Sequence, residues 1–278
     1  MAKTRASKKK VAGKARSRAR AVPAASVPGN QGEALAYGAA FWQQGLESPR
    51  AHPERLGDES LEQSERLRRL AIITFVAKPN SDLFFHNLIR SARAREIYLQ
   101  HMQEGGRLDD HHRVLGRYQP ALDAIAAGDL ERVRRIRALS PAEYRPGHEY
   151  EDDHSYAEIL HELCEATPDE GKLATMLEAL EKSLSGADPL RLDLCRALVA
   201  RDQEDFGAAL RTLLDQHGVQ AKKDWEFGKM EDGEEGRVCV EALALLRLAE
   251  RRGLATEAEY PYCPSLARVP MVAPFPGE

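Results

Sequence analysis

Histidine, cysteine and carboxylate side chains gather in two stretches of the sequence, and groups of this kind can bind a metal ion. His148, His154, His161 and Cys164 lie among acidic residues, and residues 109–112 read DDHH. Neither stretch has the HExxH spacing or the paired cysteines of a zinc site. Cys164 also falls on the apolar side of its predicted helix. We therefore expect no metal ion.

No motif of a known catalytic type accompanies these residues. The sequence has no glycine-rich phosphate loop, no GxSxG turn and no cysteine beside a recognisable histidine motif. Its four cysteines stand singly, which argues against a disulfide framework and favours a reducing, cytoplasmic setting. We expect no catalytic residue and no cofactor.

The distribution of charge along the sequence remains as an indication of what the protein binds. Residues 1–20 hold nine of the 40 Lys and Arg residues and no Asp or Glu, which leaves 31 basic against 44 acidic residues in the rest of the chain. An acidic body of this kind attracts basic surfaces and repels nucleic acid. We expect a basic protein partner, with nucleic-acid binding limited to weak contacts through residues 1–20.

Two acidic blocks in predicted loops or helix starts are the candidate partner-binding surfaces. The second lies near a tryptophan, which can anchor a partner because it offers a large area for burial within a field that steers basic proteins. The alternative is that Trp225 covers the core and the carboxylates are merely solvated. The candidate residues are Glu149, Glu151, Asp152, Asp153, Asp224, Trp225, Glu231, Asp232, Glu234 and Glu235.

The elements that position these residues are predicted to be helices. Apolar residues recur with helical spacing in 156–164, 173–184 and 206–214. Residues 71–77 (AIITFVA) are assigned to the buried end of a helix, and 238–249 are apolar nearly all round, as in a helix at the centre of a bundle. The predicted fold is all-α, either a helical bundle or an α-solenoid-like array of antiparallel helix hairpins.

Capping side chains mark the predicted helix starts. Two similar segments, 124–136 and 197–209, each indicate a helix end, a tight turn and a second helix capped by Asp129 or Asp202. Other starts are expected where Ser or Thr precedes Glu or Gln by three residues. These predicted caps are Ser60, Ser140, Ser155 and Thr167.

Composition divides the chain into a tail and a body. Residues 1–32 are basic and almost without bulky apolar side chains, so we expect a disordered tail. Residues 33–278 are expected to form a single helical domain with an extended, proline-rich end at about 259–278. No apolar run is long enough to span a membrane, and no apolar stretch follows the basic N-terminus as in a secretory signal.

A series of residues in the C-terminal third follows a recognisable order. An Asp and a Phe open a helix, a His ends it, a Trp follows in the next turn, and VEALALLRLAERRG leads to EYPYCPSLAR (259–268). This order resembles the immunity protein 49 family of polymorphic-toxin systems. It is also similar to the immunity proteins against PoNe-type DNase toxins, which end in a Tyr-Pro motif after a buried helix. The residues that match, apart from Trp225, are Asp202, Phe206, His217, Glu241, Tyr260 and Pro261.

The resemblance implies a bacterial, cytoplasmic protein that binds and neutralises a cognate toxin, such as a basic nuclease, without catalysis of its own. Two other functions fit the same residues. A helical-repeat scaffold or adaptor for another protein would lack a toxin gene beside its own. A nucleic-acid-associated protein would show salt-sensitive binding that is lost when residues 1–30 are deleted.

Overall fold

The described part of the chain is built from α-helices. The computed structural model describes residues 56–105, 111–227 and 235–276, and these contain no β-strand, which confirms the all-α prediction. None of the described helices combines the length and the hydropathy that a membrane-spanning helix needs. The elements are α2 (Leu56–Ala77), α3 (Ser81–Glu104), α4 (Gln119–Ala127), α5 (Leu130–Leu139), α6 (Glu151–Leu163), α7 (Glu170–Leu184), α8 (Leu190–Ala200), α9 (Gln203–Glu226) and α10 (Val240–Arg251), with 3-10 turns η2 (Glu235–Arg237) and η3 (Ser265–Ala267).

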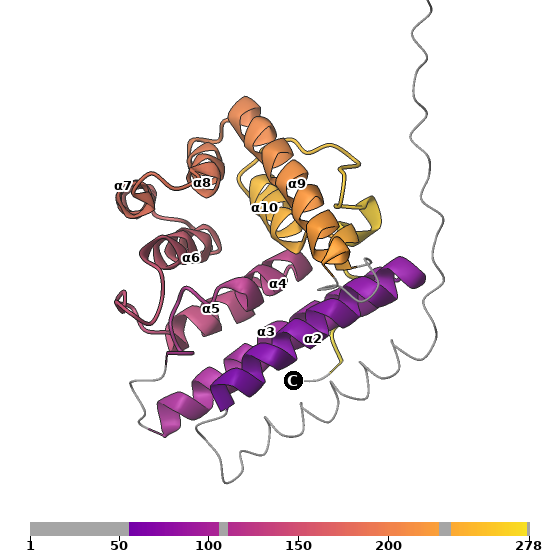
Figure 1. Ribbon diagram of the computed structural model, residues 1–278, viewed down its shortest axis with the longest axis horizontal. Helices are drawn as coiled ribbons and strands as arrows, with labels where there is room; N and C mark the ends of the chain where they lie inside the picture. The colour runs from indigo at the N-terminus through magenta and orange to yellow at the C-terminus, as the bar shows by residue number, and fades with distance from the viewer. Residues whose placement is uncertain (1–55, 106–110, 228–234, 277–278) are drawn as a thin grey trace, which may run out of the picture.

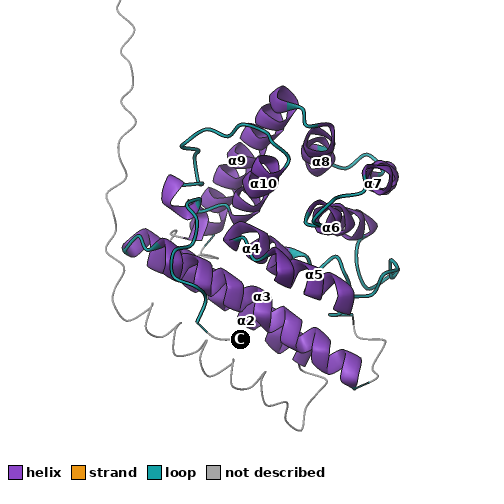
Figure 2. Cartoon of the chain, turned by 180° about the vertical axis from the view of Figure 1, so that it is seen from behind, coloured by secondary structure: helices purple, strands orange, loops and turns teal. Residues whose placement is uncertain are grey.

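These helices lie in layers. α2 and α3 form a long antiparallel hairpin, α4 and α5 pack on α3, and α10 packs on α4 (Figure 1). From α6 to α9, each helix packs on the next one along the chain, so that they form an arc beside α10 (Figure 2). The arrangement is a packed assembly of neighbouring helices, as the sequence predicts.

The two similar turns identified in the sequence have the same geometry. Gly128 (φ 82°) and Arg201 (φ 57°) are left-handed, and Asp129 and Asp202 follow them as N-caps. In both turns the Asp amide donates to the carbonyl five residues earlier, at 2.9 Å. The Asp side chains then accept from the first amides of α5 and α9, which satisfies groups the helices leave unpaired. The prediction of two capped helix–turn–helix segments is confirmed.

The predicted serine and threonine caps are wrong. Ser60 and Ser155 lie inside α2 and α6, and the buried Ser60 hydroxyl donates to the carbonyl of Ala94 on α3 at 3.1 Å. Ser140 ends α5 and no helix begins there. α7 begins two residues later than Thr167 predicts, because Asp169 caps it instead. A small hydroxyl residue serves close helix packing as well as capping, so the local pattern does not separate the two uses.

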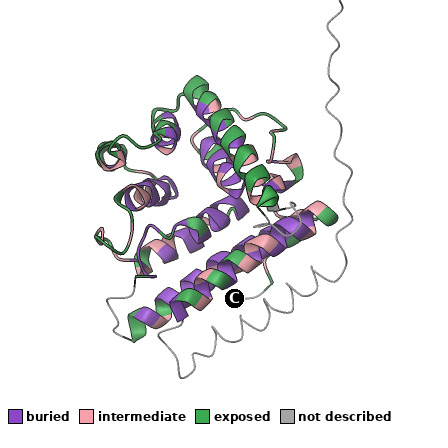
Figure 3. Ribbon diagram, viewed as in Figure 1, coloured by how far each residue is buried: buried purple, intermediate pink, exposed green. Residues whose placement is uncertain are grey.

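Most of α10 is enclosed by other elements. Val240, residues 242–246, Leu248 and Ala249 are buried, as expected for a helix that is apolar nearly all round (Figure 3). Gly253 (φ 84°) follows it in the left-handed conformation that ends many helices. Residues 71–77 form the last turns of α2, which confirms their assignment to a helix end.

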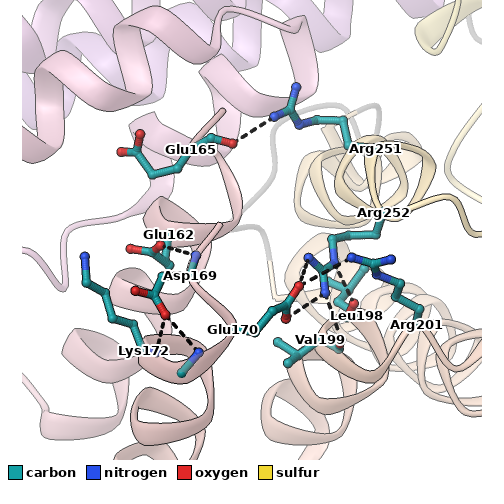
Figure 4. A network of polar contacts seen from close by, with 11 residues as sticks. Glu162, Glu165, Asp169, Glu170, Lys172, Leu198, Val199, Arg201, Arg251 and Arg252 are labelled. Carbon is teal, nitrogen blue, oxygen red and sulfur yellow. Dashed lines mark hydrogen bonds and ion pairs between the residues drawn. The ribbon is translucent and has the colours of Figure 1, made fainter. Parts of the chain in front are cut away.

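An ion-pair cluster at the far end of α10 ties three helices together. The Glu170 carboxylate at the start of α7 faces Arg252, with N–O distances of 2.9 and 3.1 Å, and Arg201 lies 3.4 Å away (Figure 4). Arg252 also donates to the carbonyls of Leu198 and Val199 in α8. The hydrogen bonds from Arg252, followed by its charge and that of Arg201, lower the pKa of Glu170. The cluster therefore joins the start of α7 to the C-terminal ends of α8 and α10.

The chain after α10 folds back over the other helices. The Tyr262 carbonyl accepts from the Cys239 amide at 2.9 Å, just before α10. Farther on, the Val272 and Ala273 amides donate to Asp82 in the first turn of α3, at 2.7 and 3.1 Å. The segment 259–276 therefore links α9 and α10 to α3. That residues 33–278 form one domain remains a prediction, and the expected tail, 1–32, lies outside the described residues.

Candidate functional site

The residues that match the immunity-protein order are distributed along α9, α10 and the segment after α10. Asp202 caps α9, and Phe206 is buried one turn later. Farther along α9, His217 Nε2 lies 3.0 Å from the Gly236 carbonyl, and its ring meets Tyr262 edge-on at 5.0 Å. The Tyr260 hydroxyl accepts from the Glu257 amide at 2.8 Å, under the guanidinium of Arg268, and the neighbouring Pro261 is exposed.

Glu241 is the centre of a polar cluster. Its carboxylate, in the first turn of α10, accepts from the Tyr156 hydroxyl at 3.0 Å and from Arg191 Nε at 3.1 Å. The Arg191 guanidinium lies over the rings of Tyr118 and Tyr156, at 5.2 and 5.1 Å, and 3.4 Å from the Asp153 carboxylate. The cluster joins α6, α8 and α10. Nothing in the leucine-rich sequence around Arg191 identifies this role.

The groups in the cluster hold fixed protonation states at neutral pH. Burial raises the pKa of the Tyr156 hydroxyl well above its usual value, so that it remains a hydrogen-bond donor. Burial alone would lower the pKa of Arg191, but the charge of Glu241, the neighbouring Tyr118 and Tyr156 and the hydrogen bond to Glu241 together outweigh it, so the pKa is raised and the guanidinium stays protonated. Burial also raises the pKa of the nearby Cys239 thiol to about 12. The cluster therefore combines a permanent cation, carboxylates and neutral donors.

The cluster forms one side of a cleft of about 840 Å³. Leucines of α7 and apolar residues of α9 form the apolar part of its wall, and carboxylates from four segments line much of the rest: α6, the turn between α7 and α8, α9 and α10. A second hollow of about 310 Å³ adjoins it and shares Arg191, His217, Cys239 and Glu241. The lining of the larger cleft is Asp152, Leu180, Leu184, Ala187, Asp188, Leu190, Arg191, Thr212, Leu213, Asp215, Gln216, His217, Val219, Gln220, Lys223, Cys239 and Glu241.

The first predicted acidic block is divided by the structure. The Glu149 side chain is only 3% exposed, and it accepts from the amides of Gly116 and Arg145 at 2.7 and 3.1 Å. Burial opposes ionisation of Glu149, but the hydrogen bond from His154 and those amides prevail, and its pKa is lowered. Glu151 is exposed in the first turn of α6, while Asp152 lines the cleft and Asp153 pairs with Arg191. Of these four carboxylates, only those of Glu151 and Asp152 are both accessible and without an ion pair to another described residue.

The second predicted block lies partly in a helix. Asp224 and Trp225 occupy the last turn of α9, whereas the sequence predicts a turn there. Trp225 is 59% exposed, so it does not cover the core, and Asp224 accepts from Gln220 at 2.8 Å. Val219 and Phe227 are exposed on the same stretch, at 56% and 77%. Glu231, Asp232 and Glu234 lie outside the described residues, and Glu235 begins η2.

The histidine-rich stretch is dispersed. His161 and Cys164 are buried and His148 is exposed, and within the described residues no group of three or more His, Cys, Asp or Glu side chains could hold a metal ion. Burial lowers the pKa of His161 to about 3, with a smaller effect in the same direction from Arg137. The imidazole is thus neutral in the folded protein throughout the neutral range.

Because His161 is buried in its neutral form, we expect the free energy of unfolding to fall as the pH is lowered. Because the pKa of His161 is lower in the folded chain than the usual 6.5, the unfolded chain binds the proton first as the pH falls. Between pH 6.5 and about 3, His161 alone should reduce the free energy of unfolding by about 1.4 kcal/mol per pH unit. Urea denaturation at pH 7, 6 and 5 measures this slope. The slope should decrease in His161→Gln and persist in His148→Gln, which alters an exposed histidine; equal slopes in both variants would contradict the assignment.

Comparison with known proteins places the chain in a family. A family model described as Immunity protein 49 matches residues 71–267, which is more than half of the chain and includes α10, the cleft and every matching residue named above. No curated protein and no solved structure matches the chain. The resemblance seen in the sequence is confirmed, and the chain belongs to the immunity protein 49 family.

Proposed function

We propose that this protein binds a cognate toxin of a polymorphic or contact-dependent toxin system and neutralises it by covering part of its surface, without catalysis of its own. The observation that carries the proposal is the family match over residues 71–267. A protein that acts by occlusion needs a rigid, complementary surface. A packed helical body in which a fixed ion-pair cluster underlies a cleft is suited to that task.

The contact surface that we propose is the cleft together with its two borders, and we call it the α6–α9 face. One border is the start of α6, where Asp152 lines the cleft and the preceding Tyr150 and Glu151 are exposed, Tyr150 to 77%. The other border is the C-terminal half of α9, where Val219 lines the cleft and Trp225 is exposed in the last turn. Exposed aromatic side chains beside carboxylates suit a basic partner, because the charges speed the encounter and the aromatics lose water on binding.

Growth protection tests this function. The chain is expressed in a sensitive host together with the toxin encoded beside its gene, and we expect growth to be restored. Reversing the charge of Glu151 and Asp152 to Lys, or of Asp215 to Lys, should weaken the complex and lower protection. Glu178→Lys, an exposed carboxylate on α7 that does not line the cleft, is the matched control. Failure of the unaltered chain to protect would contradict toxin neutralisation, and full protection by both cleft variants would exclude the α6–α9 face.

A further inference from the structure

The cleft has negative charge that its own residues leave unbalanced. Arg191 is already paired with Glu241 and Asp153. Among the described residues, the carboxylates of Asp152 and Asp215 have neither a hydrogen bond nor an ion pair, although both line the cleft. Burial lowers the pKa of His217, so this histidine is neutral at pH 7 and does not compensate. Lys223 at the rim is the other cation of the lining.

The shape of the cleft suits long cationic side chains. Leu184 and Val219 provide apolar wall beside the carboxylates. Lysine and arginine side chains place their methylene groups against such surfaces while their charged ends remain near water or an opposite charge. An occupant with several such residues, separated by small ones, fits both the walls and the charges.

The same chain carries a segment of this chemistry. Residues 1–20 read MAKTRASKKKVAGKARSRAR, with nine Lys and Arg residues, no acidic residue, and mostly Ala, Ser, Gly and Thr between them. The rest of the chain has the opposite balance, with 31 basic and 44 acidic residues. The charge of this segment is therefore complementary to that of the cleft.

The chain is also long enough to bring this segment to the cleft. Residues 21–55, 35 in number, separate it from Leu56, where α2 begins. Even at the helical rise of about 1.5 Å per residue, 35 residues span about 50 Å. Glu65, nine residues along α2 and so about 14 Å from its start, lines the hollow that adjoins the cleft. Covalent attachment then favours binding, since it makes the encounter intramolecular.

We propose that residues 1–20 occupy the α6–α9 cleft of the same molecule when no other partner is bound, with their cations near Asp152 and Asp215. A toxin must then displace this segment, so the segment screens the cleft against basic proteins that bind only by charge. This occupation of the cleft requires no toxin and is independent of toxin neutralisation.

Zero-length cross-linking of the full chain tests the proposal without a toxin. A carbodiimide joins a lysine amine to a carboxylate in direct contact, and the monomer is isolated before peptide mapping. We expect Lys3, Lys8, Lys9, Lys10 and Lys14 to link to the cleft carboxylates Asp152, Asp188 and Asp215. Glu178 and Glu204 are exposed and do not line the cleft, and their carboxylates have no hydrogen bond or ion pair among the described residues. They should form at least about tenfold fewer links, because binding in the cleft holds the lysines near the cleft carboxylates.

A charge-neutralised variant separates binding from chance contact. Asp152→Asn with Asp215→Asn should reduce the links to Asp188, which the variant retains, because the segment no longer binds beside it. Glu178→Gln with Glu204→Gln, which removes the same charge elsewhere, should leave those links unchanged. Three results would each overturn the proposal. They are links spread evenly over all exposed carboxylates, links found only in a dimer, and links to Asp188 that are equally frequent in the two double variants.

Discussion

Replacing Arg68 with alanine is expected to lower the free energy of unfolding by about 3–5 kcal/mol. Arg68 on α2 donates to both carboxylate oxygens of Asp123 on α4, at 2.7 and 2.9 Å. Asp123 is fully buried, and the Ser91 hydroxyl of α3 is its other partner, at 2.5 Å. Without Arg68 the core would hold a carboxylate with no opposing charge. Chemical denaturation followed by circular dichroism measures the loss.

An exposed ion pair provides the control for this variant. Arg196 lies 2.7 Å from Glu181, with side chains 45% and 58% exposed, so Arg196→Ala should cost about 0–1 kcal/mol. Equal losses in the two variants would show that burial of Asp123 does not decide the effect.

The pH dependence of Arg68→Ala provides a second check. Burial raises the pKa of Asp123 even in the intact protein, and loss of Arg68 removes the charge that opposes this rise. The folded variant then takes up a proton at a pH where the unfolded chain does not. Its stability deficit should therefore shrink as the pH falls through the raised pKa of Asp123. A deficit that stays constant between pH 8 and pH 5 would contradict this account.

Replacing Trp225 with alanine is expected to weaken toxin binding by about 2 kcal/mol or more, which is about 30-fold in Kd. Trp225 is exposed in the last turn of α9, two residues beyond Lys223 of the cleft lining, so it offers a large apolar area for a partner to cover. Because the side chain is largely outside the core, the free energy of unfolding should change by about 0.5 kcal/mol or less. Biolayer interferometry with a catalytically inactive form of the neighbouring toxin gives Kd, and denaturation gives stability.

Tyr150→Ala is the companion variant, because Tyr150 is an exposed aromatic residue at the start of α6, two residues before Asp152 of the cleft lining. If the partner covers the whole α6–α9 face, both variants should bind it more weakly. If it contacts only the C-terminal half of α9, only Trp225→Ala should weaken binding. Full affinity in Trp225→Ala would remove α9 from the proposed contact surface.

Local sequence determines most of the helices. The caps at Asp129 and Asp202, the end of α2 at residues 71–77 and the enclosed α10 are all predicted correctly. A cap and its amides are two or three residues apart, and an apolar face repeats every three or four, so the information lies within one or two helical turns. The family also follows from residue order along the chain. Ser60 and Ser155 fail as caps because the same residue type also serves helix packing, and the partner helix decides which use applies.

Tertiary structure decides which polar residues remain available to a partner. Glu149 and Asp152 look alike in the sequence, yet one carboxylate is buried against backbone amides and the other lines a cleft. Arg191 meets Glu241 across 50 residues, and Tyr156 meets it across 85. Pairings over such distances depend on how the helices pack, which no local spacing records. The sequence thus determines an acidic, helical body of the immunity protein 49 family, while packing alone assembles the cleft and leaves Trp225 exposed at the end of α9.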